Sequence, residues 1–125
     1  MNIIIIENEG IIALEMSSII QQLRPDYRIL KVLSSVNSAI EFLKRNRTNI
    51  DLIFSDIRLG DGMCFEVFNE VKTSIPIIFC TAFGEYAFQA INANGIAFLL
   101  KPWTIESIQI AIEKFEVFTK VNRKL

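Results

Sequence analysis

Histidine is absent from this chain of 125 residues. Its absence excludes Ser-His-Asp and Cys-His nucleophile systems, histidine metal sites and switches that depend on an imidazole titrating near neutral pH. Cysteine is scarce: only Cys64 and Cys80 occur, without a CxxC spacing, so neither a zinc site nor a disulfide scaffold is indicated. We predict that both cysteines pack in the core as small apolar residues. Any chemistry must therefore use carboxylates, hydroxyls and lysine.

The chain also lacks a strong net charge and a long apolar run. Thirteen Lys and Arg against fourteen Asp and Glu leave a net charge of -1, so no positive field exists to attract nucleic acid or an anionic membrane. Runs such as Ile3 to Ile6 fall far short of the ~18 apolar residues that span a bilayer, and no basic segment precedes them as in a secretory signal. We therefore predict no membrane association and a cytoplasmic location.

What the chain does contain is 51% apolar residues, enough for one domain with a sizeable core, in a regular alternation of strand and helix patterns. The predicted strands cover 2–6, 28–33, 50–55, 76–81 and 98–100. The predicted helices cover 10–23, 35–45, a segment with Phe65, Phe68 and Val71 after the turn 60–62, then 85–93 and a last helix capped by Thr104. Such an alternation requires crossover connections, so the predicted fold class is a doubly wound parallel α/β sheet.

Polar side chains follow four of the predicted strands, at the point where each strand ends. Because the carboxyl ends of parallel strands meet at one edge of a sheet, where α/β proteins bind ligands, these side chains are expected to converge. Their oxygens suit Mg²⁺, and a carboxylate beside Mg²⁺, a lysine and a hydroxyl suits phosphoryl transfer, with Asp56 as nucleophile. Each residue alone is more typical of a cap or a turn. The residues are Glu7 and Asn8 after the first strand, Asp56 after the third, Thr81 ending the fourth and Lys101 after the fifth.

Four motifs stand out along the chain: Ile6-Glu7-Asn8-Glu9 for an acidic pocket, the turn from Asp56 to Gly62, the strand from Pro76 to Ala82, and Leu100-Lys101-Pro102. Together they resemble the receiver domains of two-component response regulators, over almost the whole chain. The resemblance implies a flavodoxin-like fold of five strand–helix units whose strands, numbered along the chain, lie in the order 2-1-3-4-5. It also implies a cis bond between Lys101 and Pro102.

The same resemblance implies roles for individual residues. Asp56 would accept a phosphoryl group from a phosphohistidine of a sensor histidine kinase, and the chain would catalyse only this self-phosphotransfer and its own dephosphorylation. Mg²⁺ would be held by Glu7, Asn8, Asp56 and the main-chain carbonyl of Arg58. The phosphoryl oxygens would be bound by Thr81 and Lys101, and the switch residues would be Thr81 and Phe98. Arg58 and Phe83, each two positions beyond a pocket residue, are candidates for tuning the lifetime of the phosphorylated state.

The segments 82–94 and 98–102 resemble receivers attached to LytTR-type DNA-binding domains. The subfamily implies that residues 1–125 are a regulatory half and that a DNA-binding output domain follows Leu125. Separately, because phosphorylation would let Phe98 turn inward, we predict a homodimer through the face made by the helix over 85–93, the strand over 98–100 and the last helix. The residues predicted around this face are Tyr86, Phe88, Ile91 and Trp103, of which Ile91 is predicted to be buried and Trp103 to lie at the surface.

Two departures from the family pattern leave alternatives open. Asn8 stands where most receivers have a metal-ligating aspartate, which lowers the charge of the pocket and predicts weaker Mg²⁺ binding. The alternative function is therefore a pseudo-receiver, a protein interaction module that is not phosphorylated. Phe98 lacks a tyrosine hydroxyl, so a switch there would act through packing. A haloacid dehalogenase-type phosphatase is less consistent, because the Asp-x-Asp pair and a cap domain are missing, and nucleotide-binding glycine loops are missing too.

Overall fold

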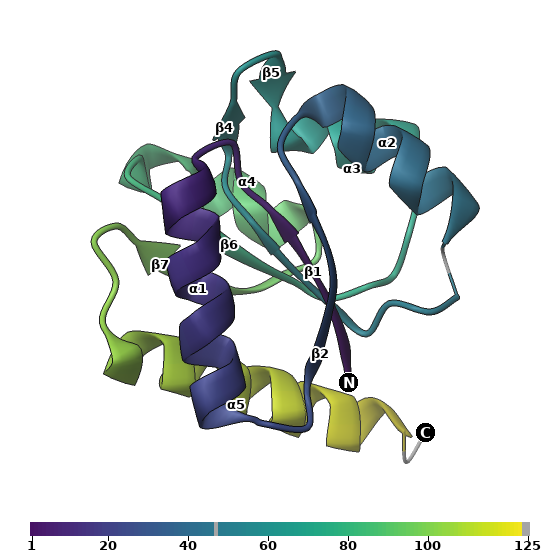
Figure 1. Cartoon of the computed structure of the whole chain (residues 1–125). Helices are drawn as coiled ribbons and strands as arrows, with labels where there is room; N and C mark the ends of the chain where they lie inside the picture. Colours follow the sequence, from purple (N-terminus) through teal and green to yellow (C-terminus); the bar gives the residue numbers. More distant parts are fainter. Residues whose placement is uncertain (47, 124–125) are drawn as a thin grey trace.

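Five parallel strands form the centre of the molecule (Figure 1). The computed structural model describes residues 1–46 and 48–123, apart from the side chains of residues 88, 122 and 123. The sheet has the order β2-β1-β3-β6-β7, which confirms the predicted topology once a separate two-stranded hairpin is left out of the numbering. Its strands are β1 (Asn2–Ile6), β2 (Arg28–Leu33), β3 (Leu52–Ser55), β6 (Ile77–Thr81) and β7 (Gly95–Leu100).

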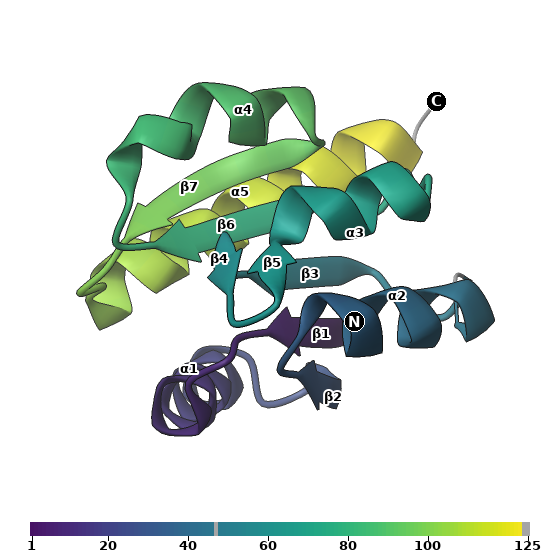
Figure 2. The same cartoon turned by 90° about the horizontal axis from the view of Figure 1, so that it is seen from above.

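Helices cover both faces of the sheet (Figures 1 and 2). On one face, α1 (Gly10–Leu23) and α5 (Ile105–Arg123) pack against one half of the core. On the other, α2 (Val36–Arg45), α3 (Cys64–Glu70) and α4 (Ala87–Asn92) pack against the other half. Because β1 is buried on both faces, its side chains Ile3, Ile4, Ile5 and Ile6 are all apolar and all buried. The doubly wound class predicted from the alternation is confirmed.

Local signals placed several element ends correctly. The Thr104 hydroxyl accepts a hydrogen bond from the amide of Ser107 (3.0 Å), as expected for a residue that caps α5.

Cys64 and Cys80 are both buried and free, as predicted. The bond between Lys101 and Pro102 is cis. No helix in the described part of the chain is long and apolar enough to cross a membrane.

The turn after Asp56 contains more structure than its glycines predict. Strands β4 (Arg58–Leu59) and β5 (Gly62–Met63) form a short antiparallel hairpin there. The carboxylate of Asp61, at the tip, accepts hydrogen bonds from the backbone amides of Val36 (2.8 Å) and Asn37 (3.1 Å). Because these amides begin α2, they have no partner within that helix. The hairpin is thereby tied to α2, and the hydrogen bonds lower the pKa of the Asp61 carboxyl.

Four expectations for the segment 85–103 differ from the structure. The segment predicted as one helix over 85–93 is a 3-10 turn, η1 (Gly84–Tyr86), followed by α4, and β7 begins three residues before the predicted strand. Ile91 is 69% exposed, because Ala90 faces the core and the next residue of a helix points about 100° away. Trp103 is half-buried and packs against the core beside α1 and α5. The predicted dimer-face residue Phe88 has a side chain outside the described part.

Candidate functional site

Glu7, Asp56 and Lys101 meet at the carboxyl edge of the sheet, as predicted. The Lys101 ammonium donates a hydrogen bond to Glu7 Oε1 (2.7 Å) and another to Asp56 Oδ2 (2.9 Å). Both acids are almost fully buried, with 5% and 7% of their surface exposed. A lysine more than forty residues further along the chain than either acid therefore bridges two buried carboxylates.

Backbone hydrogen bonds beyond the strand ends position these side chains. The amide of Asp56 donates to Ile6 O (2.8 Å), and the amide of Lys101 donates to Thr81 O (2.9 Å). The ladder between neighbouring parallel strands thus continues one residue past each strand, which brings the side chains of adjacent strands to the same level. The amide of Ile57 also donates to Asp56 Oδ1 (2.7 Å), so one oxygen of Asp56 is held by the backbone while the other faces Lys101.

The pocket holds more negative than positive charge. Burial, followed by the hydrogen bond and charge interaction with Asp56, raises the pKa of Glu7 to about 7, although Lys101 acts in the opposite direction. Burial lowers the pKa of Lys101, but its hydrogen bonds to the two carboxylates outweigh that effect and raise it overall. One ammonium between two buried carboxylates leaves a negative charge that a proton or a further cation would neutralise.

Thr81 is fully buried at the end of β6. Its hydroxyl oxygen accepts a hydrogen bond from the amide of Phe83 (3.4 Å), so among the described residues Thr81 stands beside the carboxylate–lysine network and does not join it. Phe98 is half-buried on β7, where it pairs with Phe79 of β6 and packs against the core under α2, α3 and α4. The two predicted switch residues thus lie on neighbouring strands.

The remaining predicted site residues lie at the same edge of the sheet, since Asn8 follows β1 and Arg58 begins β4, two residues after Asp56. The Asn8 and Arg58 side chains are both exposed. The Arg58 guanidinium stacks on the ring of Phe83, 4.1 Å from its centroid, and donates a hydrogen bond to the Tyr86 hydroxyl (3.1 Å). The sequence singled out Arg58 and Phe83 by their equal offset from pocket residues, but it contained no signal that Tyr86 would join them.

Glu9 belongs to the acidic motif that the sequence analysis quoted, but no role was predicted for it. Its carboxylate lies 3.9 Å from the Lys101 ammonium, at the solvent-exposed side of the pocket. The sequence shows Glu9 two residues after Glu7. The direction of its side chain could not be predicted, because α1 begins at the next residue and the angle between β1 and α1 sets that direction.

The donor atoms present suit Mg²⁺. Mg²⁺ prefers oxygen ligands, keeps several waters and is usually bound through one or two carboxylates. Glu7 and Asp56 supply two carboxylates within reach of a single cation, since the Lys101 ammonium contacts both. The described residues contain no group of three acids, histidines or cysteines that would form a complete protein cage. The arrangement therefore fits a partly hydrated Mg²⁺ and not a fully protein-ligated metal.

Comparison with known proteins agrees with this geometry. Residues 3–113 match the family model described as the response regulator receiver domain. LytT of Bacillus anthracis, a sensory transduction protein, is 27% identical over 119 residues, which cover 93% of this chain and 47% of LytT. LytR of Streptococcus mutans is 30% identical over 118 residues, covering 91% of this chain and 48% of LytR. The chain therefore spans about half the length of these curated relatives.

Solved structures show the same fold. A receiver domain protein from Clostridium thermocellum superposes with a TM-score of 0.82 at 20% identity, covering 96% of this chain and 97% of that one. The response regulatory domain of mrkE from Klebsiella pneumoniae also gives 0.82, at 24% identity, covering 94% and 96%. The names of the sequence relatives agree with the predicted LytTR-type resemblance. On the match over residues 3–113, this chain belongs to the family of response regulator receiver domains.

Proposed function

We propose that the chain is a working receiver in which Asp56 accepts a phosphoryl group from a sensor histidine kinase. The observation that carries the proposal is the contact of Asp56 Oδ2 with the Lys101 ammonium (2.9 Å) inside a buried acidic pocket. A carboxylate oxygen of Asp56 attacks phosphorus and forms the O–P bond. The P–N bond of the donor phosphohistidine breaks, and its electron pair returns to the imidazole ring, which takes up a proton.

The residues around Asp56 have separate tasks in this proposal. Mg²⁺, when bound, supplies positive charge to the phosphoryl oxygens, and it would be held by Glu7, Asn8, Asp56 and the main-chain carbonyl of Arg58. Lys101 is placed to pair its ammonium with a phosphoryl oxygen, because it already contacts Asp56. The Thr81 hydroxyl would donate to another oxygen after leaving the amide of Phe83.

Phosphorylation would then change the face formed by α4, β7 and α5. A phosphoryl group adds about 1.5 to 2 negative charges and three acceptor oxygens. Attraction of Thr81 and Lys101 toward it would shift the end of β6 and let Phe98 repack, which biases an existing two-state equilibrium. Ile91, Leu100, Ile110 and Val117 are exposed apolar residues of these elements. This face is our candidate dimer surface, and the half-buried Trp103 is not part of it.

The output of the switch is also part of the proposal. The chain spans about half of each LytT or LytR relative, and those proteins are named for sensory transduction. We propose, from the LytTR-type resemblance, that the rest of such a protein contains a DNA-binding output domain controlled by dimerisation of the receiver. A pseudo-receiver that acts without phosphorylation is the second candidate, because Asn8 lowers the charge of the pocket and Lys101 already bridges the two acids.

Intact mass distinguishes these two candidates. Incubation with acetyl phosphate and Mg²⁺ is expected to add one phosphoryl group to the natural chain and none to the Asp56→Ala variant. Asp26→Ala, which removes an exposed carboxylate in the loop after α1, is the matched control and is expected to be phosphorylated normally. No adduct at saturating Mg²⁺ would refute the receiver proposal and support the pseudo-receiver.

The Asn8→Asp variant is expected to bind Mg²⁺ on the order of tenfold more tightly than the natural chain. The added carboxylate places one more negative charge at the mouth of the pocket, and a unit charge near a divalent ion contributes about this much in a largely aqueous setting. Trp103, the only tryptophan, reports binding through its fluorescence, because its ring lies 5.8 Å from the Lys101 ammonium.

The control for this prediction is Asn49→Asp, which adds the same charge at an exposed position before β3. Its Mg²⁺ affinity is expected to equal that of the natural chain. Equal affinity of all three proteins would show that residue 8 does not contribute to the metal site.

A further inference from the structure

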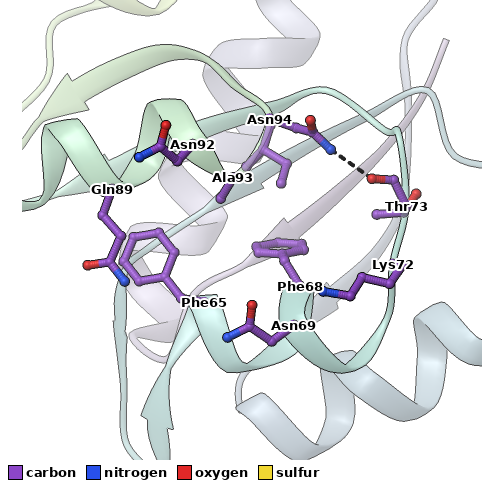
Figure 3. Close-up of a pocket in the computed structure, with 10 residues that line it drawn as sticks. Phe65, Phe68, Asn69, Lys72, Thr73, Gln89, Asn92, Ala93 and Asn94 are labelled. Carbon is purple, nitrogen blue, oxygen red and sulfur yellow. Dashed lines mark hydrogen bonds between the residues drawn. The ribbon is translucent and has the colours of Figure 1, made fainter.

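A groove lies between α3 and α4 at the far end of the sheet from Asp56. Its walls come from the end of α3, the segment after it and the end of α4, next to Ile77 at the start of β6. Its volume is about 330 Å³, near the lower end of the ~300–1,000 Å³ that is usual for small-molecule sites. At one end, the side-chain amide of Asn94 donates a hydrogen bond to Thr73 O (2.7 Å) and closes the groove (Figure 3).

The groove combines an aromatic floor with a polar rim. Phe65 is buried and Phe68 half-buried, and Figure 3 shows both rings facing the space between the helices. The rim carries the exposed side-chain amides of Asn69, Gln89 and Asn92, which offer both donors and acceptors.

Lys72 gives the groove a positive charge. It is exposed at the rim, and it forms no ion pair with any residue that the structure describes. No acidic side chain is among the described residues that line the groove. The planar apolar part of a ligand would therefore stack on the two phenylalanine rings, while its anionic group would bind the Lys72 ammonium and the side-chain amides.

We infer that this groove is an effector site for a small aromatic carboxylate, separate from the phosphorylation site and coupled to it. The groove accounts for the binding: its volume suits one or two rings, and its charge selects an anion over a neutral analogue. The coupling would be carried by aromatic side chains that extend from the floor of the groove toward Asp56.

An unbroken series of ring contacts joins the groove to the mouth of the acidic pocket. Because close-packed interiors transmit strain, we expect an occupant that moves the first ring to change the position of the last. The centroid distances are 6.2 Å for Phe68–Phe79, 5.6 Å for Phe65–Phe79, 6.4 Å for Phe65–Tyr86 and 6.4 Å for Phe83–Tyr86, and the Arg58 guanidinium lies 4.1 Å from the Phe83 centroid. Arg58 and Phe83 are each two residues from Asp56 or Thr81, so occupancy is coupled to the state of that site.

The binding test uses the side-chain amides of the rim as reporters. The ¹⁵N-labelled chain is titrated with indole-3-carboxylate and, as a matched neutral probe, indole-3-carboxamide, and the side-chain NH₂ signals of Asn69, Gln89 and Asn92 are followed by NMR. We expect saturable shifts of these signals with a dissociation constant of about 1 mM or below for the carboxylate. The neutral amide is expected to bind about fivefold more weakly, since one exposed ion pair contributes on that scale.

Matched lysine variants test the role of charge. Lys72→Met is expected to lose the preference for the carboxylate, whereas Lys31→Met, at an exposed position on β2, is expected to keep it. The absence of saturable shifts up to about 10 mM, equal binding of carboxylate and amide, or shifts confined to another face would each overturn the proposed site.

The coupling part rests on the proposed phosphorylation of Asp56, whereas the binding part does not. The titration is repeated after treatment with acetyl phosphate and Mg²⁺, with the extent of phosphorylation read by intact mass in the same sample. We expect the dissociation constant to change at least about fivefold, the lower end of typical coupling between sites. Equal affinity in a sample shown to be phosphorylated would overturn the coupling. Failure of phosphorylation itself would appear in the mass spectrum and count against the receiver proposal instead.

Discussion

Replacing Lys101 by Met is expected to destabilise the fold by about 3–5 kcal/mol near neutral pH, because removing one partner from a buried ion pair leaves the other uncompensated. Lys101 is the only cation within 4 Å of Glu7 or Asp56 among the described residues. Without it, two carboxylates that are at least 93% buried face each other. Urea unfolding at pH 7 in the absence of Mg²⁺ measures the loss directly.

Two conditions are expected to restore part of the lost stability. The deficit of Lys101→Met is expected to be smaller at pH 7 than at pH 9, because Lys101 lowers the pKa of Glu7, so without it a proton stays on Glu7 at pH 7 and removes one of the facing charges. Mg²⁺ also shrinks the deficit by replacing the missing cation, since a ligand that binds only the native state stabilises it. Lys31→Met, at an exposed position on β2, is the control and is expected to change stability by less than about 0.5 kcal/mol. A loss of under 1 kcal/mol for Lys101→Met would contradict the buried-charge account.

Glu7→Gln is expected to stabilise the metal-free chain by up to about 3 kcal/mol above pH 7. Burial raises the pKa of Glu7 from 4.5 to about 7 in the native state. Between these values the folded chain holds a proton that the unfolded chain has released, so stability falls as the pH rises from about 4.5 to about 7. Glutamine keeps the shape and a hydrogen-bond acceptor for Lys101 but carries no charge, so this part of the pH dependence disappears.

Urea unfolding of both proteins without Mg²⁺, at several pH values from 5 to 8, tests this prediction. The two curves are expected to lie close together at pH 5 and to separate progressively up to about pH 7, with the variant more stable. Glu41→Gln, which neutralises an exposed glutamate on α2, controls for the change in net charge and is expected to follow the natural chain. A constant gap between Glu7→Gln and the natural chain at every pH would exclude Glu7 as its source.

The candidate site was largely predictable because its residues follow strands directly. In a parallel sheet every strand ends at the same edge, so reading Glu7, Asp56 and Lys101 as residues that follow apolar strands was enough to place them together. The deep burial of Thr81 was not predictable from the same reading, because it depends on what covers the end of β6.

Contacts between loops were beyond the reach of the sequence. The stack of Arg58 on Phe83 depends on the β4–β5 hairpin and the turn before α4 approaching each other, and no periodic pattern encodes that approach. Ile91 was misjudged for a related reason. A helix as short as α4 has too few residues for a periodic pattern to show which side faces the core. Its packing on the sheet turns Ala90 inward and Ile91 outward.

The sequence by itself determined the order of strands and helices, the doubly wound class and the identity of the acidic pocket, because all three depend on period and on position along the chain. Only the tertiary structure decided the charges and surfaces: the bridge of Lys101 to both acids, the raised pKa of Glu7 and the groove between α3 and α4. These features arise from distances between residues far apart in the chain and from the water that packing excludes. Neither these distances nor the exclusion of water can be predicted from the local sequence.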